Sequence, residues 1–132
     1  MTTERLDVSD VLGPSPGYAY GARVSGGTTV YCAGAVPVDP EGNLIGRGDL
    51  QAQTQAVLAN LRAVLDRANA APADVVKTTI FVAGQQREDL PEVWRAFAQT
   101  PFVDAPSTLV GVTHLGYEGQ LVEIEAIAVT DG

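Results

Sequence analysis

The alternation of residues between Gln120 and Val129 is the feature that most constrains the fold. Apolar side chains occupy every second position there, as in a β-strand that buries one face: Val122, Ile124, Ala126 and Ala128. Glu123 and Glu125 fall on the other face. Because carboxylates are rarely buried without a partner, that face must meet water, a cation or another subunit. A half-exposed strand with a polar outer face explains the same spacing, so spacing alone does not indicate catalysis.

The hydrophobic period divides the rest of the chain into strands and helices. Alternating or β-branched runs predict further strands at Tyr18–Ser25, Thr28–Cys32, Val75–Val82 and Asp104–Leu115. Apolar spacing of three and four residues predicts a helix of about five turns after its N-cap, Asp49, and a shorter helix from Asp89 to Gln99. This order indicates a single α+β domain, residues 1–132, with two helices on one face of a mixed β-sheet.

Glycine and proline predict the connections near the N-terminus. Gly26-Gly27 separates two of the expected strands and is typical of a tight hairpin turn. Residues 9–17 contain two glycines and two prolines, and we expect a stiff loop there. Two helices cover one face of the sheet only, and Tyr18 and Tyr20 are expected on the other. An uncovered face of that kind predicts a closed homo-oligomer with clefts between its subunits.

Charge and composition restrict the classes of partner. Eight basic and sixteen acidic residues give a net charge of −8, which argues against nucleic acid as a partner. One cysteine and one histidine make a zinc site unlikely to form, and we expect no metal and no other cofactor. No apolar run has the length of a membrane span or a signal sequence, so we expect a cytoplasmic protein without a membrane partner.

Few side chains are candidates for chemistry. Glu123 is a candidate general base for water. Ser107 and Thr108 follow a proline at a strand entry, where hydroxyls commonly cap backbone groups. His114, expected on the strand surface, is about 23 Å from Ser107 along an extended chain and cannot activate it within one subunit. Tyr18 is suited equally to covering a ligand or to packing at an interface.

Two further positions complete the candidates. Cys32 lies in an apolar strand without neighbouring cations, so it is interpreted as a small buried hydrophobe. Ala33-Gly34 follows it with the smallest side chains, and backbone could approach a ligand there.

In combination, these segments resemble the Rid proteins, the reactive intermediate deaminases also called the YjgF or L-PSP family. The matching segments are Pro16-Gly17-Tyr18, Tyr31–Asp39 (Tyr-Cys-Ala-Gly-Ala-Val-Pro-Val-Asp), Gln53-x-x-x-Val57-Leu58-x-Asn60-Leu61, Asp74–Val82 (Asp-Val-Val-Lys-Thr-Thr-Ile-Phe-Val) and Val122–Ala128. The resemblance implies a chorismate-mutase-like fold and a homotrimer with a central β-barrel. It also implies three small-molecule sites between neighbouring subunits. Tyr18, Gly34 and Glu123 match pocket positions of the family, and Glu123 matches the one associated with the attacking water.

One departure from the family pattern concerns substrate binding. In deaminating members a P-A-R-S-x-V segment supplies an arginine that holds the carboxylate of a 2-imino acid through two parallel hydrogen bonds. Alignment on Val110-Gly111-Val112 places Ser107 at that position. Neither Arg23 nor Lys77 is an evident substitute. Ala35 and Pro91 also stand where the family has polar residues.

Two functions from different classes follow from the resemblance. In the first, the chain is a divergent Rid enzyme that hydrolyses an imine, enamine or similar C–N bond but is not a standard 2-imino acid deaminase. Glu123 would direct water, and Tyr18, Ala33, Gly34, Ser107 and Thr108 would bind the substrate. In the second, it is a non-catalytic trimer that binds a small molecule. The ribonuclease label that the family also carries fits poorly with a net charge of −8.

Overall fold

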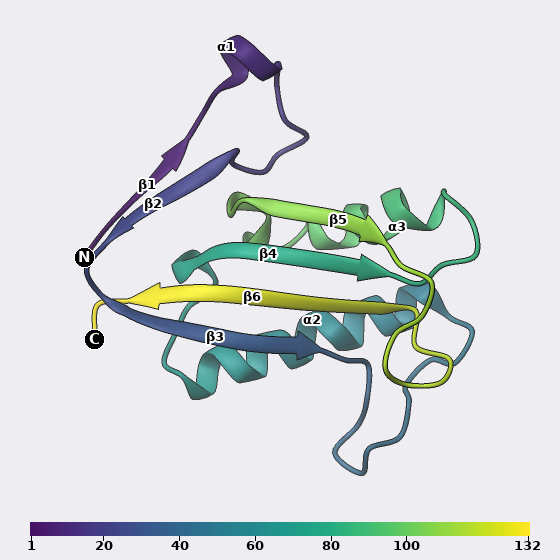
Figure 1. Cartoon of the computed structure of the whole chain (residues 1–132). Helices are drawn as coiled ribbons and strands as arrows, with labels where there is room; N and C mark the ends of the chain where they lie inside the picture. The colour runs from purple at the N-terminus through teal and green to yellow at the C-terminus, as the bar shows by residue number, and fades with distance from the viewer.

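A four-stranded mixed sheet forms the centre of the molecule, in a computed structural model that describes residues 1–132. Its strand order is β3-β6-β4-β5 (Figure 1). The strands are β3 (Thr28–Ala35), β6 (Val122–Thr130), β4 (Val75–Val82) and β5 (Ser107–Gly111). β6 runs antiparallel to both β3 and β4, and β4 runs parallel to β5. The strand predicted at Val75–Val82 is confirmed at both ends.

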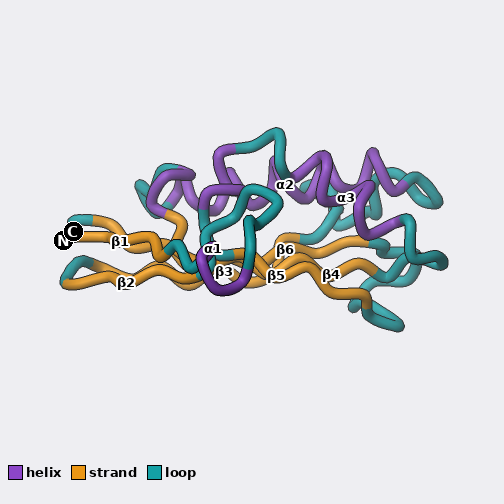
Figure 2. The backbone as a smooth tube through the Cα atoms, turned by 90° about the horizontal axis from the view of Figure 1, so that it is seen from above, coloured by secondary structure: helices purple, strands orange, loops and turns teal.

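Both long helices lie on one face of this sheet, as the sequence predicts (Figure 2). They are α2 (Leu50–Arg67) and α3 (Asp89–Phe97). Asp49 is the N-cap of α2, and its Oδ1 accepts a hydrogen bond of 3.0 Å from the Ala52 N–H. The core between helices and sheet contains side chains with no exposed surface: Val57, Leu61, Leu65, Ile80, Phe97, Val122 and Ile124. None of the helices is both long and apolar enough to cross a bilayer.

The N-terminal segment forms a two-stranded ribbon that extends beyond the sheet (Figure 1). β1 (Thr2–Leu6) pairs antiparallel with β2 (Gly21–Ser25), and a short helix, α1 (Ser9–Leu12), connects them. The hairpin expected at Gly26-Gly27 is therefore wrong, although both residues have a positive φ, 77° and 87°. β2 pairs instead with β1, a strand that was not predicted from the sequence.

Close packing explains why glycine occupies the junction between β2 and β3. A Cβ at Gly27 would lie 2.6 Å from the Thr130 carbonyl oxygen, so the chain crosses directly against the end of β6. The ammonium group of Met1 lies 3.6 Å from Asp131 Oδ1 at the same end. Both termini are therefore close together, as Figure 1 shows.

Two strand predictions are too long. Tyr18 and Tyr20 precede β2 and are not on the sheet. β5 begins at Ser107, because residues 101–104 form a 3-10 turn, and it ends at Gly111. His114 is exposed in the following loop rather than on a strand, as a correction to the sequence analysis. β4 lies between β5 and β6, so these two strands do not pair.

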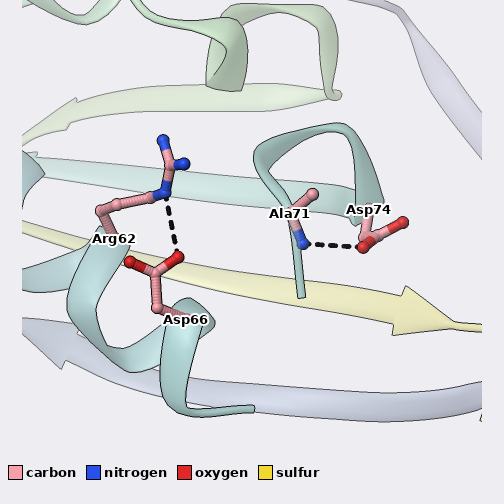
Figure 3. A network of polar contacts seen from close by, with 4 residues as sticks. All are labelled: Arg62, Asp66, Ala71 and Asp74. Atoms are coloured by element: carbon pink, nitrogen blue, oxygen red, sulfur yellow. Dashed lines mark hydrogen bonds and ion pairs between the residues drawn. The ribbon is translucent and has the colours of Figure 1, made fainter. Parts of the chain in front are cut away.

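Polar contacts hold the connection between α2 and β4 (Figure 3). In the last turns of α2, Arg62 Nε lies 3.1 Å from Asp66 Oδ1. After the helix, the Ala71 N–H donates a hydrogen bond of 2.8 Å to Asp74 Oδ2. The turn at residues 72–74 then leads directly into β4, which carries Lys77.

Candidate functional site

Three of the residues expected to bind substrate line one cavity. Tyr18, Ser107 and Thr108 face a space of about 810 Å³ between the segment before β2, the strand β5 and the helix α3. The other residues that line it are Pro16, Arg87, Glu88, Leu90, Pro91, Trp94 and Leu109. The Tyr18 ring meets the Trp94 ring edge to face, with 5.7 Å between centroids. Trp94 thus fixes Tyr18 beside the start of β5.

A second cavity, of about 440 Å³, adjoins the first. Tyr18, Ser107 and Thr108 line both cavities, and the second also contains Lys77 and residues of β2. Lys77 Nζ donates hydrogen bonds to Thr108 Oγ1 at 2.7 Å and to the Thr78 carbonyl oxygen at 3.1 Å. Parallel pairing of β4 with β5 brings Lys77 and Thr108 together. Thr108 pairs with Thr79, which lies on the same face of β4 as Lys77.

The two hydroxyl side chains have different surroundings. The Ser107 hydroxyl donates to the Ala105 carbonyl oxygen at 2.9 Å and accepts from Thr78 Oγ1 at 2.7 Å. The Ser107 hydroxyl therefore caps a backbone carbonyl at the strand entry, as hydroxyls after a proline commonly do. Thr108 is exposed and accepts from Lys77. The hydroxyl hydrogen of Thr108 therefore remains available to donate to a ligand, whereas that of Ser107 is donated to Ala105.

Partial burial affects the ammonium group of Lys77. Loss of water around its ammonium group lowers the pKa of Lys77, while the Glu125 carboxylate acts in the opposite direction. Lys77, which was not an evident substitute for the arginine in the sequence, lines a cavity with Tyr18, Ser107 and Thr108. The sequence signal for Lys77 is a cation within a β-branched strand. Its neighbour on β5, Thr108, can be identified only once the strand order is known.

Glu123 belongs to a second cluster, on the sheet face that the helices leave open. Glu123 is half-buried, and its Oε1 accepts a hydrogen bond of 3.0 Å from Gln120 Nε2. A Cβ at Gly34 would lie 2.6 Å from Glu123 Cδ and would overlap its Oε2. The small residue at position 34 thus makes room for the Glu123 carboxylate. Ala33 precedes it and is exposed.

The two clusters do not meet within one chain. β5 and β6 are the two neighbours of β4 in the sheet. Ser107 of β5 pairs with Thr78 of β4, whereas Glu123 of β6 pairs with Phe81 of β4. Three residues along a strand correspond to about 10 Å. Glu123 lines neither of the two cavities described above. One chain therefore brings Tyr18, Ser107 and Thr108 together and, separately, Glu123 and Gly34.

Cys32 is not part of either cluster. Only 7% of its surface is exposed, which confirms its interpretation as a small buried hydrophobe. Burial raises the pKa of the Cys32 thiol, and so disfavours the reactive thiolate. No group of three or more His, Cys, Asp or Glu side chains is arranged to hold a metal ion.

An α+β domain with both long helices on one face of its sheet, and with cavities at the β5 edge, defines the structural class. Comparison with known proteins then identifies the family. Residues 12–130 match the family model described as Endoribonuclease L-PSP. The chain belongs to this family, which confirms the resemblance to Rid proteins stated above.

Individual relatives cover almost the whole chain. The crystal structure of YyfB from Yersinia pestis, described as a Rid family protein of unknown function, is 33% identical, with a TM-score of 0.89, and covers 98% of this chain and 100% of that one. The 2-iminobutanoate/2-iminopropanoate deaminase of Dermatophagoides farinae is 34% identical over 134 residues, 99% of this chain and 100% of that protein. A RutC family protein of Pyrococcus abyssi is 32% identical over 87% of this chain and 89% of its own.

Proposed function

We propose that this protein is a divergent Rid enzyme that hydrolyses the C–N bond of a small imine or enamine. The proposal rests on the surroundings of the Glu123 carboxylate. Gln120 holds Glu123 Oε1, and Gly34 leaves space for Oε2, which no hydrogen bond within the chain engages. Similarity to a 2-iminobutanoate/2-iminopropanoate deaminase along 99% of the chain supports the reaction class.

The reaction requires a base and a water molecule. Glu123 Oε2 takes a proton from water as the water oxygen bonds to the imine carbon. The protonated Glu123 returns this proton to the imine nitrogen, which gives a carbinolamine. A second proton then passes from the carbinolamine hydroxyl through Glu123 to the nitrogen as the C–N bond breaks. Ammonia leaves, the carbon retains the oxygen as a carbonyl, and the Glu123 carboxylate is restored. An enamine first gains a proton on carbon and follows the same route. Gln120 orients the Glu123 carboxylate, since its amide N–H donates to Oε1 at 3.0 Å.

The complete site is proposed to lie between subunits of a homotrimer. Tyr18, Ser107 and Thr108 would bind the substrate from one subunit, and Glu123, Gly34 and Ala33 would reach it from the neighbour. The separation of these two clusters within one chain supports such an arrangement. The cytoplasm is the proposed location.

Substrate choice is proposed to differ from that of standard 2-imino acid deaminases. The Ser107 hydroxyl already donates to Ala105 and has no charge with which to hold a carboxylate. A serine cannot reproduce the two parallel hydrogen bonds of a guanidinium group. Hydrolysis of 2-imino acids should therefore be slower than in an arginine-bearing member of the family.

The test compares imine hydrolysis with and without the protein. Imines are generated in situ by oxidation of the parent amine or amino acid, and ammonia release is followed. Glu123→Gln keeps the shape and removes the base, so it should lower turnover roughly 100-fold or more, by the usual contribution of a general base. Glu125→Gln is the matched control, because Glu125 is exposed on the same face of β6.

Several results would contradict the enzymatic proposal. Equal activity of the wild type and Glu123→Gln would remove Glu123 from the mechanism. Absence of ammonia release from every imine tested, with ligand binding retained, would favour a non-catalytic trimer that binds a small molecule. That second function is supported by one observation: the cavities beside Tyr18, Ser107 and Thr108 form without the candidate base, Glu123.

A further inference from the structure

We propose that Lys77 and Thr108 form the binding site for the carboxylate of a small anionic substrate. The site lies in the cavity of about 440 Å³ between β2 and the first residues of β4 and β5. This inference rests on the proposed function and specifies it, because it assigns the charge of the molecule whose C–N bond is hydrolysed. Lys77 would also supply the positive charge that Ser107 lacks.

Counting hydrogen-bond donors shows that the site has capacity for a ligand. An ammonium group has three N–H donors. Two of them are used within the chain, by Thr108 Oγ1 at 2.7 Å and by the Thr78 carbonyl oxygen at 3.1 Å. The third is free. Thr108 accepts from Lys77, so its own hydroxyl hydrogen is also free to donate. Two adjacent donors, one of them charged, match the two oxygens of a carboxylate.

Lys77 has no anionic partner within the chain. The two ion pairs of the structure join Met1 to Asp131 and Arg62 to Asp66. Glu125, the acidic residue whose charge acts on Lys77, is exposed and lies beyond the 4.0 Å limit of an ion pair. A half-buried ammonium group without a counter-charge is costly, and an anionic ligand would offset that cost.

Other cations near the cavities are less suitable. Arg87 lines the larger cavity, but it is exposed, next to Glu88, and no hydrogen bond fixes its guanidinium group. Arg23 is on β2 and lines neither cavity. Of the cations that line the two cavities, Lys77 is the one whose side chain is held in place, by a contact within β4 and a contact to the neighbouring strand β5.

The chain as a whole favours a small monoanion over a larger anion. A net charge of −8 repels polyanions at a distance, whereas a monocarboxylate loses little on approach. A cavity of about 440 Å³ accepts a molecule of a few carbon atoms beside Tyr18. Carboxylate recognition here uses a point charge and a hydroxyl in place of a planar guanidinium fork.

The test measures binding, independently of turnover. The probe is 2-oxobutanoate, a stable carbonyl compound, with its neutral amide as the control, and affinities are obtained by ligand-observed NMR titration. The wild type should bind the carboxylate and not the amide. Lys77→Met should weaken binding roughly 10- to 100-fold, the value of one hydrogen bond to a charged group. Lys77→Arg should retain most of the affinity.

Three further variants sharpen the result. Arg23→Met removes one positive charge outside the cavity and should leave affinity unchanged. Thr108→Val removes the hydroxyl at an exposed position with nearly the same shape, and it should weaken binding even if Lys77→Met folds poorly. Loss of binding in Arg87→Met with full binding in Lys77→Met would overturn the assignment. Equal affinity for the amide, tighter binding of inorganic phosphate, or no carboxylate binding by the wild type would do so as well.

Failure of this inference and of the proposed function can be told apart. Glu123→Gln should still bind 2-oxobutanoate, because it keeps the shape of the side chain and leaves Lys77 and Thr108 intact, whereas it should lose imine hydrolysis. Carboxylate binding that depends on Lys77, without any imine hydrolysis, would retain the anion site and reject the enzyme. Imine hydrolysis that does not respond to Lys77→Met would retain the enzyme and reject the anion site.

Discussion

At the scale of single residues, Gly34 and Glu123 depend on each other. The Glu123 carboxylate lies where a side chain at position 34 would be, with its Cδ 2.6 Å from the position of a Cβ. Gly34 does not have a positive φ, so its backbone conformation does not require glycine. The requirement is the space that the carboxylate occupies, which ties the small residue to the candidate base.

This dependence gives a prediction for Gly34→Ala. The methyl group should displace the Glu123 carboxylate and break its hydrogen bond with Gln120. Because the displaced atoms are the end of a flexible side chain, the free energy of unfolding should fall by only about 1 kcal/mol. Imine hydrolysis should fall at least tenfold. Thermal unfolding and ammonia release measure the two effects, and Ala33→Ser, at the exposed neighbour, is the control. Unchanged activity would show that this carboxylate position is not needed.

Residue roles could be predicted from the sequence only where they depend on local spacing. Alternation along one strand placed Glu123 and Glu125 on a common face, and the structure confirms it, with Glu123 half-buried and Glu125 exposed. The contact of Lys77 with Thr108 could not be predicted, because Thr108 is 31 residues away on a parallel strand. Parallel strands are joined by a crossover, so no turn fixes their register in the sequence.

At the scale of elements, α2 does more than cover the sheet. Gln53, in its first turn, has no exposed surface. Its Nε2 donates to the carbonyl oxygens of Gly46 at 3.1 Å and Gly119 at 3.0 Å, and its Oε1 accepts from the Leu121 N–H at 2.8 Å. These bonds attach the helix to the loop that leads into β6, two residues before Glu123.

Replacement of Gln53 by leucine should therefore affect both stability and the site. It removes three hydrogen bonds and leaves buried backbone groups without partners, so the free energy of unfolding should fall by about 3 to 5 kcal/mol. The thermal midpoint should fall by roughly 10 °C or more. Gln51→Leu is the matched control, because Gln51 is exposed in the same turn. Similar midpoints for both variants would show that the Gln53 contacts carry little stability.

The elements themselves could be predicted where one period continues for many residues. The spacing of three and four residues identified α2, and Asp49 identified its start. The N-terminal ribbon was missed, because Gly26-Gly27 is as typical of a hairpin as of a sharp crossing between two sheets. The pairing of β2 with β1 and the close approach of Gly27 to Thr130 distinguish the two, and both involve residues distant in the sequence. The separation of Glu123 from the Tyr18 cavity likewise depends on strand order rather than on any local pattern.

At the scale of the whole molecule, one face of the sheet has no helix over it (Figure 2). Tyr31 lies on that face and is 78% exposed, and Val110 is 36% exposed. Apolar side chains on an open sheet face are typical of a surface that another subunit covers. The same face carries Glu123, so its covering would bring residues of a neighbour toward the candidate base.

We therefore predict that the protein is a homotrimer in solution. Light scattering in dilute buffer should give about three times the chain mass of 13.8 kDa. Tyr31→Glu places a charge on the open face and should shift the mass toward that of one chain, with loss of any imine hydrolysis. Tyr117→Glu is the control, since Tyr117 is 48% exposed in the loop before β6. A wild-type protein that remains monomeric at micromolar concentration would remove the inter-subunit site. Glu123 and the Tyr18 cavity would then have to act separately.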